Sequence, residues 1–158
     1  MIRVLFVCTG NICRSPMADA VFQDMVEKAG LADQIEADSA GTTAYHVGET
    51  AHRGTLKKLR EADIDYGGRS RLLIEADLET FDYVLAMDAS HLRQIRQMAG
   101  KDVDTEVAMF LSYANEDGTT QTTDVIDPYY NNKFDLVYDL VEKGCRSLLS
   151  HIRAEHDL

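Results

Sequence analysis

The distribution of apolar residues along the chain predicts four strands. Residues 2–7 and 83–87 are nearly continuous apolar runs without the alternation of a half-exposed strand. Residues 35–39 and 107–111 are predicted as two further strands. Nearly continuous apolar strands are typical of a parallel sheet that is covered on both faces. The pattern therefore favours a sheet that lies between two layers of helices.

Between these strands, apolar residues recur at the three- and four-residue spacing of helices. In one such segment Leu56 and Leu59 are expected to face the core. Gly30 and Gly100 are natural end points for two others. The predicted helices cover residues 17–29, 52–62, 74–80, 89–99 and 134–153.

The remaining segments are expected to be loops. Residues 40–48 are irregular in pattern, and residues 65–71 contain Gly67-Gly68 and are predicted as a loop or a strand end. Residues 112–132 are rich in Asn, Asp, Gly and Thr and are predicted as one long loop. Loops of that length are often functional.

The order of these elements predicts an α/β fold. A chain of 158 residues fits one compact domain. We expect a single three-layer domain over residues 1–158, with a four-stranded parallel sheet flanked by helices in a doubly wound arrangement. Ligands of such folds bind at the carboxyl ends of the strands, where Cys8 follows the first apolar run.

Composition and charge narrow the classes of function. The net charge of −11 argues against nucleic-acid binding, which normally requires a basic face. No apolar run approaches a membrane span, and residues 1–4 lack the features of a signal peptide. Three cysteines cannot all pair within one chain, so we expect reduced thiols and a cytoplasmic protein. A monomer is the default expectation.

Residues 8–16 have the layout of an anion-binding loop with a thiol at its centre. A strand that passes through a tight loop into a helix directs backbone N–H groups and the helix dipole at one point. A thiolate at Cys8 would be favoured in that field and available as a nucleophile. The planar fork of Arg14 can hold two phosphate oxygens at once. Because the whole chain is acidic, this local positive field is necessary for an anionic substrate.

Other residues of the loop fit the same interpretation. Gly10 and Asn11 tolerate positive φ, Ser15 is able to donate a hydrogen bond to the thiolate, and Pro16 suits the first turn of a helix. The spacing of Cys8 and Arg14 alone is weak evidence, since chance produces it in roughly one such chain in seven. The alternative is a buried structural cysteine.

The loop at residues 8–16, Met87-Asp88 and the later Asp127-Pro128-Tyr129-Tyr130 together resemble a low-molecular-weight protein tyrosine phosphatase. The resemblance runs from residue 2 to the last helix and implies the phosphotyrosine phosphatase I-like fold. It implies that Cys8 is the nucleophile, Arg14 the transition-state clamp and Asp127 the general acid. It further implies substrate-binding or loop-supporting roles for Thr9, Gly10, Asn11, Ile12, Cys13, Ser15, Ser39, Tyr45, Tyr129 and Tyr130.

The proposed acid agrees with the chemistry, because a carboxylic acid on a mobile loop can protonate a leaving phenolate and later deprotonate water. Taken alone, Asp127 would be interpreted as a turn residue before Pro128. Tyr129 and Tyr130 would be interpreted as packing residues, and Asp88 as a helix cap. No cofactor is implied, and no His/Cys cluster has the spacing of metal ligands.

One position departs from many relatives. A histidine that helps to orient the loop asparagine is replaced here by Gly68, which leaves open what supports Asn11. His46 and His52 are interpreted as surface residues. Cys13 has two interpretations, a partner for a reversible disulfide with Cys8 and a buried spacer thiol.

Four functions share this loop. Hydrolysis of phosphotyrosine proteins is the expected one, because the apolar Ile12 favours a flat aromatic ring. Hydrolysis of phosphoarginine is the alternative, although related enzymes have a threonine at that position. Arsenate reduction is disfavoured because residues 88–105 contain no cysteine for a thiol relay. Binding of phosphorylated partners without turnover would not need Asp127.

Overall fold

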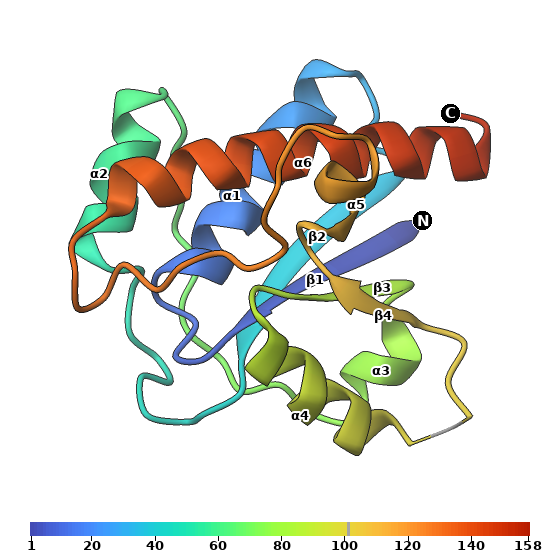
Figure 1. Cartoon of the computed structure of the whole chain (residues 1–158), viewed down its shortest axis with the longest axis horizontal. Coiled ribbons are helices and arrows are strands. Elements are labelled where there is room, and N and C mark those ends of the chain that lie inside the picture. The colour runs from blue at the N-terminus through green and yellow to red at the C-terminus, as the bar shows by residue number, and fades with distance from the viewer. Residues whose placement is uncertain (101) are drawn as a thin grey trace.

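The four predicted strands form one parallel sheet in the order β2-β1-β3-β4. The computed structural model describes residues 1–100 and 102–158. The strands are β1 (Ile2–Cys8), β2 (Ile35–Gly41), β3 (Tyr83–Ala86) and β4 (Glu106–Met109), and each adjacent pair is parallel. The predicted fold class, a single doubly wound α/β domain, is confirmed (Figure 1).

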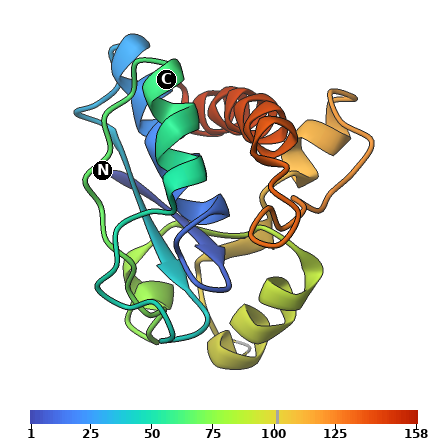
Figure 2. The same cartoon turned by 90° about the vertical axis from the view of Figure 1, so that its left-hand side faces the viewer.

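Helices cover both faces of the sheet. One face carries α1 (Arg14–Lys28), α2 (Arg53–Glu61), α5 (Ser112–Glu116) and α6 (Phe134–His156), and the other carries α3 (Asp77–Thr80) and α4 (Ala89–Ala99). Figure 2 shows these two helical layers on opposite sides of the strands. Because successive side chains of a strand point to opposite faces, Val4 and Phe6 join one apolar core while Leu5 and Val7 join the other.

The central strand β1 positions the loop that follows it. It pairs with β2 up to the Cys8–Gly41 pair and with β3 up to the Val7–Ala86 pair. The chain leaves β1 toward α1 on one face and leaves β3 toward α4 on the other, so the two connections diverge. Such a divergence opens a crevice at the carboxyl ends of the strands, and Cys8 lies there.

Several boundaries differ from the predictions. The helix α1 begins at Arg14, three residues before the predicted start, because the Cys13 carbonyl already accepts from the Met17 N–H. The strand β2 continues to Gly41, which was expected to be irregular. The Gly41 N–H and carbonyl bond to Arg71 and Leu73, so a segment distant in sequence extends this strand.

The predicted long loop was wrong in its first part. Residues 112–116 form α5, a helix too short to show a period, and its Tyr113 and Ala114 are buried. The helix α6 also continues past residue 153 to His156. No helix among residues 1–100 and 102–158 has the length and apolar character needed to cross a membrane.

Candidate active site

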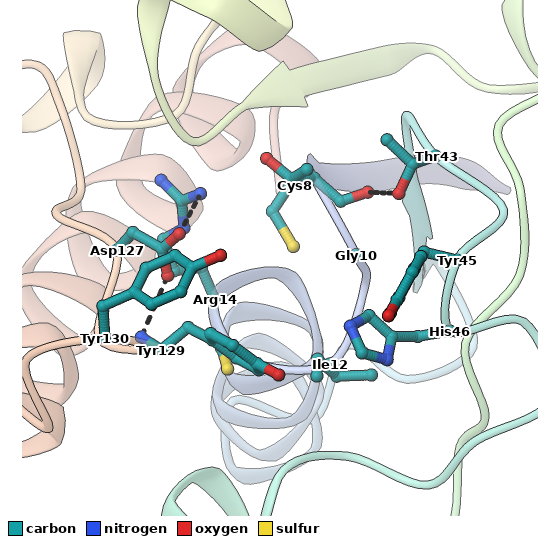
Figure 3. Close-up of a pocket in the computed structure, with 12 residues that line it drawn as sticks. Cys8, Gly10, Ile12, Arg14, Thr43, Tyr45, His46, Asp127, Tyr129 and Tyr130 are labelled. Atoms are coloured by element: carbon teal, nitrogen blue, oxygen red, sulfur yellow. Dashed lines mark hydrogen bonds and ion pairs between the residues drawn. The ribbon is translucent and has the colours of Figure 1, made fainter.

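A cavity of about 420 Å³ opens at the carboxyl end of β1. Three separate segments of the chain meet there, namely the loop that begins at Cys8, residues 43–46 and residues 127–130 (Figure 3). The side chains that line the cavity are Cys8, Thr9, Gly10, Ile12, Cys13, Arg14, Thr43, Tyr45, His46, Asp127, Tyr129 and Tyr130. All three predicted catalytic side chains therefore share one space.

The conformation of the loop explains two of its residues. Asn11 has a φ of 58°, the left-handed region in which asparagine is well tolerated. A positive φ was also expected for Gly10, but Gly10 does not have one. It must be small for another reason, because a Cβ at Gly10 would lie 2.7 Å from a ring carbon of His46.

Hydrogen bonds behind the loop decide which acceptors remain for the hydroxyl hydrogen of Ser15. The Asn11 amide uses one hydrogen for Ser15 Oγ at 2.7 Å and the other for Ser39 Oγ at 2.9 Å, while its oxygen accepts from the Arg71 N–H. Ser15 Oγ already accepts from Asn11, and its own hydrogen has two acceptors within reach, Cys8 Sγ at 3.0 Å and the Ala40 carbonyl at 3.5 Å, of which the sulfur is the nearer. This arrangement places a donor against the sulfur and thereby favours a thiolate.

Tyr66 explains how Asn11 is supported when residue 68 is a glycine. The Tyr66 hydroxyl donates to Asp19 Oδ2 at 3.0 Å, and its oxygen lies 3.4 Å from Ser39 Oγ. A Cβ at Gly68 would lie 2.4 Å from that hydroxyl oxygen, so the ring occupies the space that any larger residue would need. Asn11 therefore rests on Ser39 and Tyr66.

The guanidinium of Arg14 is buried and held from behind. Its Nη1 donates to Asp88 Oδ2 at 2.8 Å and to the Val125 carbonyl at 2.9 Å. Burial acts to raise the pKa of Asp88, but hydrogen bonds from Ser90 and Arg14 outweigh it and hold that pKa at about 2. Asp88 is the predicted cap of α4 and also orients Arg14.

A neutral histidine completes this side of the loop. Burial lowers the pKa of His91 to about 4, and its Nδ1 accepts from the Asp88 N–H. Its Nε2 therefore carries the hydrogen and donates to Thr9 Oγ1 at 2.8 Å. The start of α4 is thus bonded to the cysteine loop through two side chains, Asp88 and His91.

Asp127 reaches the cavity from the segment that precedes α6. Its Oδ2 lies 3.8 Å from Arg14 Nη2, and its Oδ1 accepts from the Tyr129 N–H in a turn. The side chain is 42% exposed, in contrast to the buried guanidinium beside it. A carboxyl group in this position can exchange protons with water and with a group bound in the cavity.

Aromatic side chains form the outer rim of the cavity. Tyr45 and Tyr130 are 84% and 85% exposed, and Tyr129 is 42% exposed. The rings of Tyr129 and Tyr130 meet edge to face at 4.9 Å, and His46 lies between Tyr45 and Tyr129. Figure 3 shows Tyr129 and Tyr130 on one side of the opening and Tyr45 and His46 on the other, with the Cys8 sulfur between the two sides.

Cys13 behaves as a packed thiol. Burial, together with neighbouring Cys8 and Asp127, raises its pKa to about 12. Its carbonyl accepts from Thr55 Oγ1 at 3.0 Å, which ties α2 to the start of α1. All three cysteines are free and buried. These surroundings favour the spacer interpretation of Cys13 over the redox one.

The predicted site residues separate into two groups. Asn11, Ser15 and Ser39 lie behind the loop and support it, whereas the other predicted residues line the cavity. The sequence did not indicate Thr43 and His46 in the lining, nor Tyr66, His91 and the contact of Asp88 with Arg14 behind it. His46 was interpreted as a surface residue, yet its side chain is only 16% exposed. The only indication in the sequence that His46 lines the cavity was its position next to the predicted site residue Tyr45.

Among the described residues, no three metal-ligating side chains of the cavity lie close enough together to share an ion. One such group, Glu106, His151 and Glu155, lies elsewhere, where β4 approaches α6. The positive charge available to an anion in the cavity comes from Arg14, the loop N–H groups and the start of α1.

Fold and loop together define an α/β protein with a cysteine-centred anion-binding loop at the end of its central strand. The chain belongs to the low molecular weight phosphotyrosine protein phosphatase family, whose model matches residues 3–158. Two curated relatives match along the whole chain. The low molecular weight protein-tyrosine-phosphatase YfkJ of Bacillus subtilis is 44% identical over 159 residues, covering 100% of both chains. PtpA of Staphylococcus aureus, of the same description, is 37% identical over 158 residues, covering 100% of this chain and 98% of the relative.

Solved structures agree with these relatives. The crystal structure of YfkJ superposes with a TM-score of 0.92 and covers 98% of this chain and 96% of the other. A Drosophila arginine phosphatase superposes with a TM-score of 0.89 at 28% identity and covers 96% of this chain and 98% of the other. The fold is therefore shared by relatives that are named for different phosphorylated residues.

Proposed function

We propose that this protein is a protein-tyrosine phosphatase that hydrolyses phosphotyrosine monoesters through a cysteinyl-phosphate intermediate. The observation that carries the proposal is that Cys8, Arg14 and Asp127, which come from two distant segments, line one cavity. Family membership supports the same conclusion. The family also makes phosphoproteins the substrates.

In the first step the Cys8 thiolate attacks the phosphorus atom in line with the leaving oxygen. The S–P bond forms as the P–O bond to the tyrosine breaks, and the carboxyl group of Asp127 gives its proton to the departing phenolate. Arg14 and the loop N–H groups neutralise the charge that spreads over the other phosphoryl oxygens. The hydroxyl of Ser15 stabilises the sulfur as an anion before and after this step.

In the second step the Asp127 carboxylate takes a proton from water. The resulting nucleophile attacks phosphorus, the S–P bond breaks, and the Cys8 thiolate is restored as phosphate leaves. The exposure of Asp127 suits this step because the carboxylate must meet water from outside the loop.

The lining of the cavity favours an aromatic substrate. Ile12 and the rings of Tyr45, Tyr129 and Tyr130 line the same cavity as the cysteine loop and offer apolar surfaces against which a phenyl ring can pack. The alternative substrate is phosphoarginine, which is favoured only by the similarity to a Drosophila arginine phosphatase. A cytoplasmic location is part of this proposal and is supported by three free thiols.

Turnover of p-nitrophenyl phosphate by the wild type, Cys8→Ser and Asp127→Ala tests the reaction. We expect kcat to fall at least about 10⁴-fold in Cys8→Ser and about 10²- to 10³-fold in Asp127→Ala. Cys145→Ser and Asp124→Ala are matched controls, because the first removes a buried thiol of α6 and the second a carboxylate of the same loop as Asp127. Equal losses in Asp124→Ala and Asp127→Ala would contradict the acid assignment.

The substrate class is tested by phosphotyrosine and phosphoarginine peptides of otherwise identical sequence. We expect kcat/KM to be higher for phosphotyrosine. Faster release of phosphate from phosphoarginine would refute the proposed substrate. Phosphoproteins captured by Asp127→Ala, which should bind substrate and turn it over slowly, would identify the physiological partner.

A further inference from the structure

A second cavity of about 570 Å³ adjoins the active-site cavity. The two share Ile12, His46 and Tyr129 as a common wall. Figure 3 shows these three side chains along one border of the active-site pocket. The far side of the second cavity is formed by residues 48–52 and by Arg69. Anything bound over the common wall would therefore touch both cavities.

Arg69 gives the second cavity a positive charge. The residue is exposed, and among the described residues its guanidinium has no carboxylate partner. Its Nη1 donates to the Gly48 carbonyl at 2.9 Å, and a backbone bridge joins Thr50 and Arg69. These bonds hold the guanidinium at the edge of the cavity while its other N–H donors stay available.

Glu49 is the only carboxylate in the lining of the second cavity among the described residues, and it is directed to His46. Its Oε2 lies 2.8 Å from His46 Nδ1. His52 is the remaining basic side chain in the lining of the second cavity, beside Arg69 and His46. Burial and the neighbouring Arg53 and His46 lower its pKa, and its Nδ1 accepts from the Gly54 N–H. Neutral His52 therefore carries its hydrogen on Nε2 and offers a donor rather than an acceptor.

We propose that the second cavity is a subsite for an acidic side chain, Asp or Glu, that lies within two residues of the phosphotyrosine in the substrate protein. This inference rests on the proposed function. The carboxylate would bind Arg69 while the peptide backbone crosses the wall formed by Ile12, His46 and Tyr129. An extended peptide advances only about 3.3 to 3.6 Å per residue, which keeps the residue within reach of the adjoining cavity.

The charge of the whole protein makes this subsite selective. With a net charge of −11, the surface disfavours acidic peptides at long range. An acidic residue is therefore favoured only where a local cation such as Arg69 outweighs that field. The subsite would select the position of the acidic residue, and a generally acidic peptide would gain little.

The test is a set of phosphotyrosine peptides with Glu, Ala or Lys at each of the four positions from −2 to +2 around phosphotyrosine. The measured quantity is the ratio of kcat/KM for Glu over Lys at each position, because effects common to all peptides cancel in it. We expect one position at which this ratio reaches about threefold to tenfold, as for a partly exposed ion pair. At about 0.5 M salt the ratio should approach one.

Three variants identify the residue responsible. Arg69→Gln should bring the ratio at that position to within about twofold of one, and Arg69→Glu should invert it. Glu49→Gln should raise the ratio, because it removes a negative charge from the lining of the second cavity. Arg93→Gln, which deletes an exposed arginine of α4 outside both cavities, should leave the wild-type ratio.

The outcomes separate the subsite from the reaction itself. Phosphotyrosine turnover with no position dependence, or with a ratio that Arg69→Gln and Arg93→Gln change equally, would overturn the subsite and leave the proposed function intact. Absence of turnover with every phosphotyrosine peptide would overturn both. A preference confined to one position and lost with Arg69 supports the proposal.

Discussion

The inner side of the cysteine loop and the outer rim of the cavity differ in how firmly their side chains are held. Cys8, Asn11, Arg14 and Ser15 are at most 3% exposed, and each side chain has a partner within the protein. The rim consists of Asp127 and of Tyr45, Tyr129 and Tyr130, which are 42 to 85% exposed. The part that meets the phosphate is thus preorganised, whereas the part that meets the rest of the substrate remains adaptable.

This difference has a physical reason. A phosphoryl group is the same in every substrate, and donors fixed in advance stabilise its transition state without reorganisation during the reaction. The residues around a phosphotyrosine vary between proteins, so exposed rings can serve many of them. Substitutions on the inner side, and substitutions of the acid Asp127, should therefore reduce kcat, while substitutions of the rim tyrosines should act on KM and on specificity.

Among the substitutions that test this difference, Arg14→Lys should have the largest effect on kcat. Lysine keeps the charge but loses the planar fork and cannot bond Asp88, the Val125 carbonyl and a phosphate together. We expect kcat for p-nitrophenyl phosphate to fall about 10³-fold with the fold intact by circular dichroism. Arg93→Lys is the control. A fall of less than about tenfold would show that charge alone suffices and that preorganisation is unimportant.

Asp127→Asn should show a loss that depends on the leaving group. The amide cannot give a proton to the departing oxygen, so kcat/KM should fall about 10²-fold or more for alkyl-substituted phenyl phosphates and progressively less for better leaving groups. A series of aryl phosphates measures this slope for the wild type and the variant. Parallel slopes would mean that Asp127 does not act as an acid.

Asp19, which lies behind the cysteine loop, should make the free energy of unfolding depend on pH. Burial raises its pKa from 3.8 to about 6, so the folded state holds this proton more tightly than the unfolded state. The contribution is fully present below about pH 4 and is lost as pH rises through about 6, a change of about 3 kcal/mol for about two pKa units. Urea unfolding of Asp19→Asn should therefore show a flatter pH dependence than the wild type.

The surface variant Asp139→Asn on α6 is the control for this measurement. It should retain the wild-type dependence on pH. An Asp19→Asn variant whose free energy of unfolding still follows the wild-type curve between about pH 4 and 7 would assign the dependence to another group.

Tyr130→Ala should have the smallest effect. Its ring is 85% exposed and bonds nothing in the described structure, so it can contribute only contact area to a bound substrate. We expect KM for phosphotyrosine peptides to rise about twofold to fivefold with kcat almost unchanged. A loss of kcat comparable to that of Asp127→Asn would instead give Tyr130 a role in the chemical step.

The sequence predicted the sheet because its strands are apolar and its helices periodic, and both are local properties. It also predicted the cysteine loop, since residues 8–16 are contiguous. The helix α5 and the end of β2 were missed because Tyr113 and Gly41 owe their conformations to packing and pairing with distant segments. Tyr66 was missed for the same reason, since nothing near it in sequence indicates that it reaches Ser39.

Because Tyr66 occupies the space beside Gly68, the residues at these two positions depend on each other. A side chain at position 68 would collide with the phenol, and removal of the phenol would leave a void behind Ser39. A change at either position alone would disturb the Ser39–Tyr66 contact and so weaken the support of Asn11, whose bonds to Ser15 and the Arg71 N–H would remain. Relatives of this chain should therefore show the two positions changing together, and a variant that changes only one of them should lose activity.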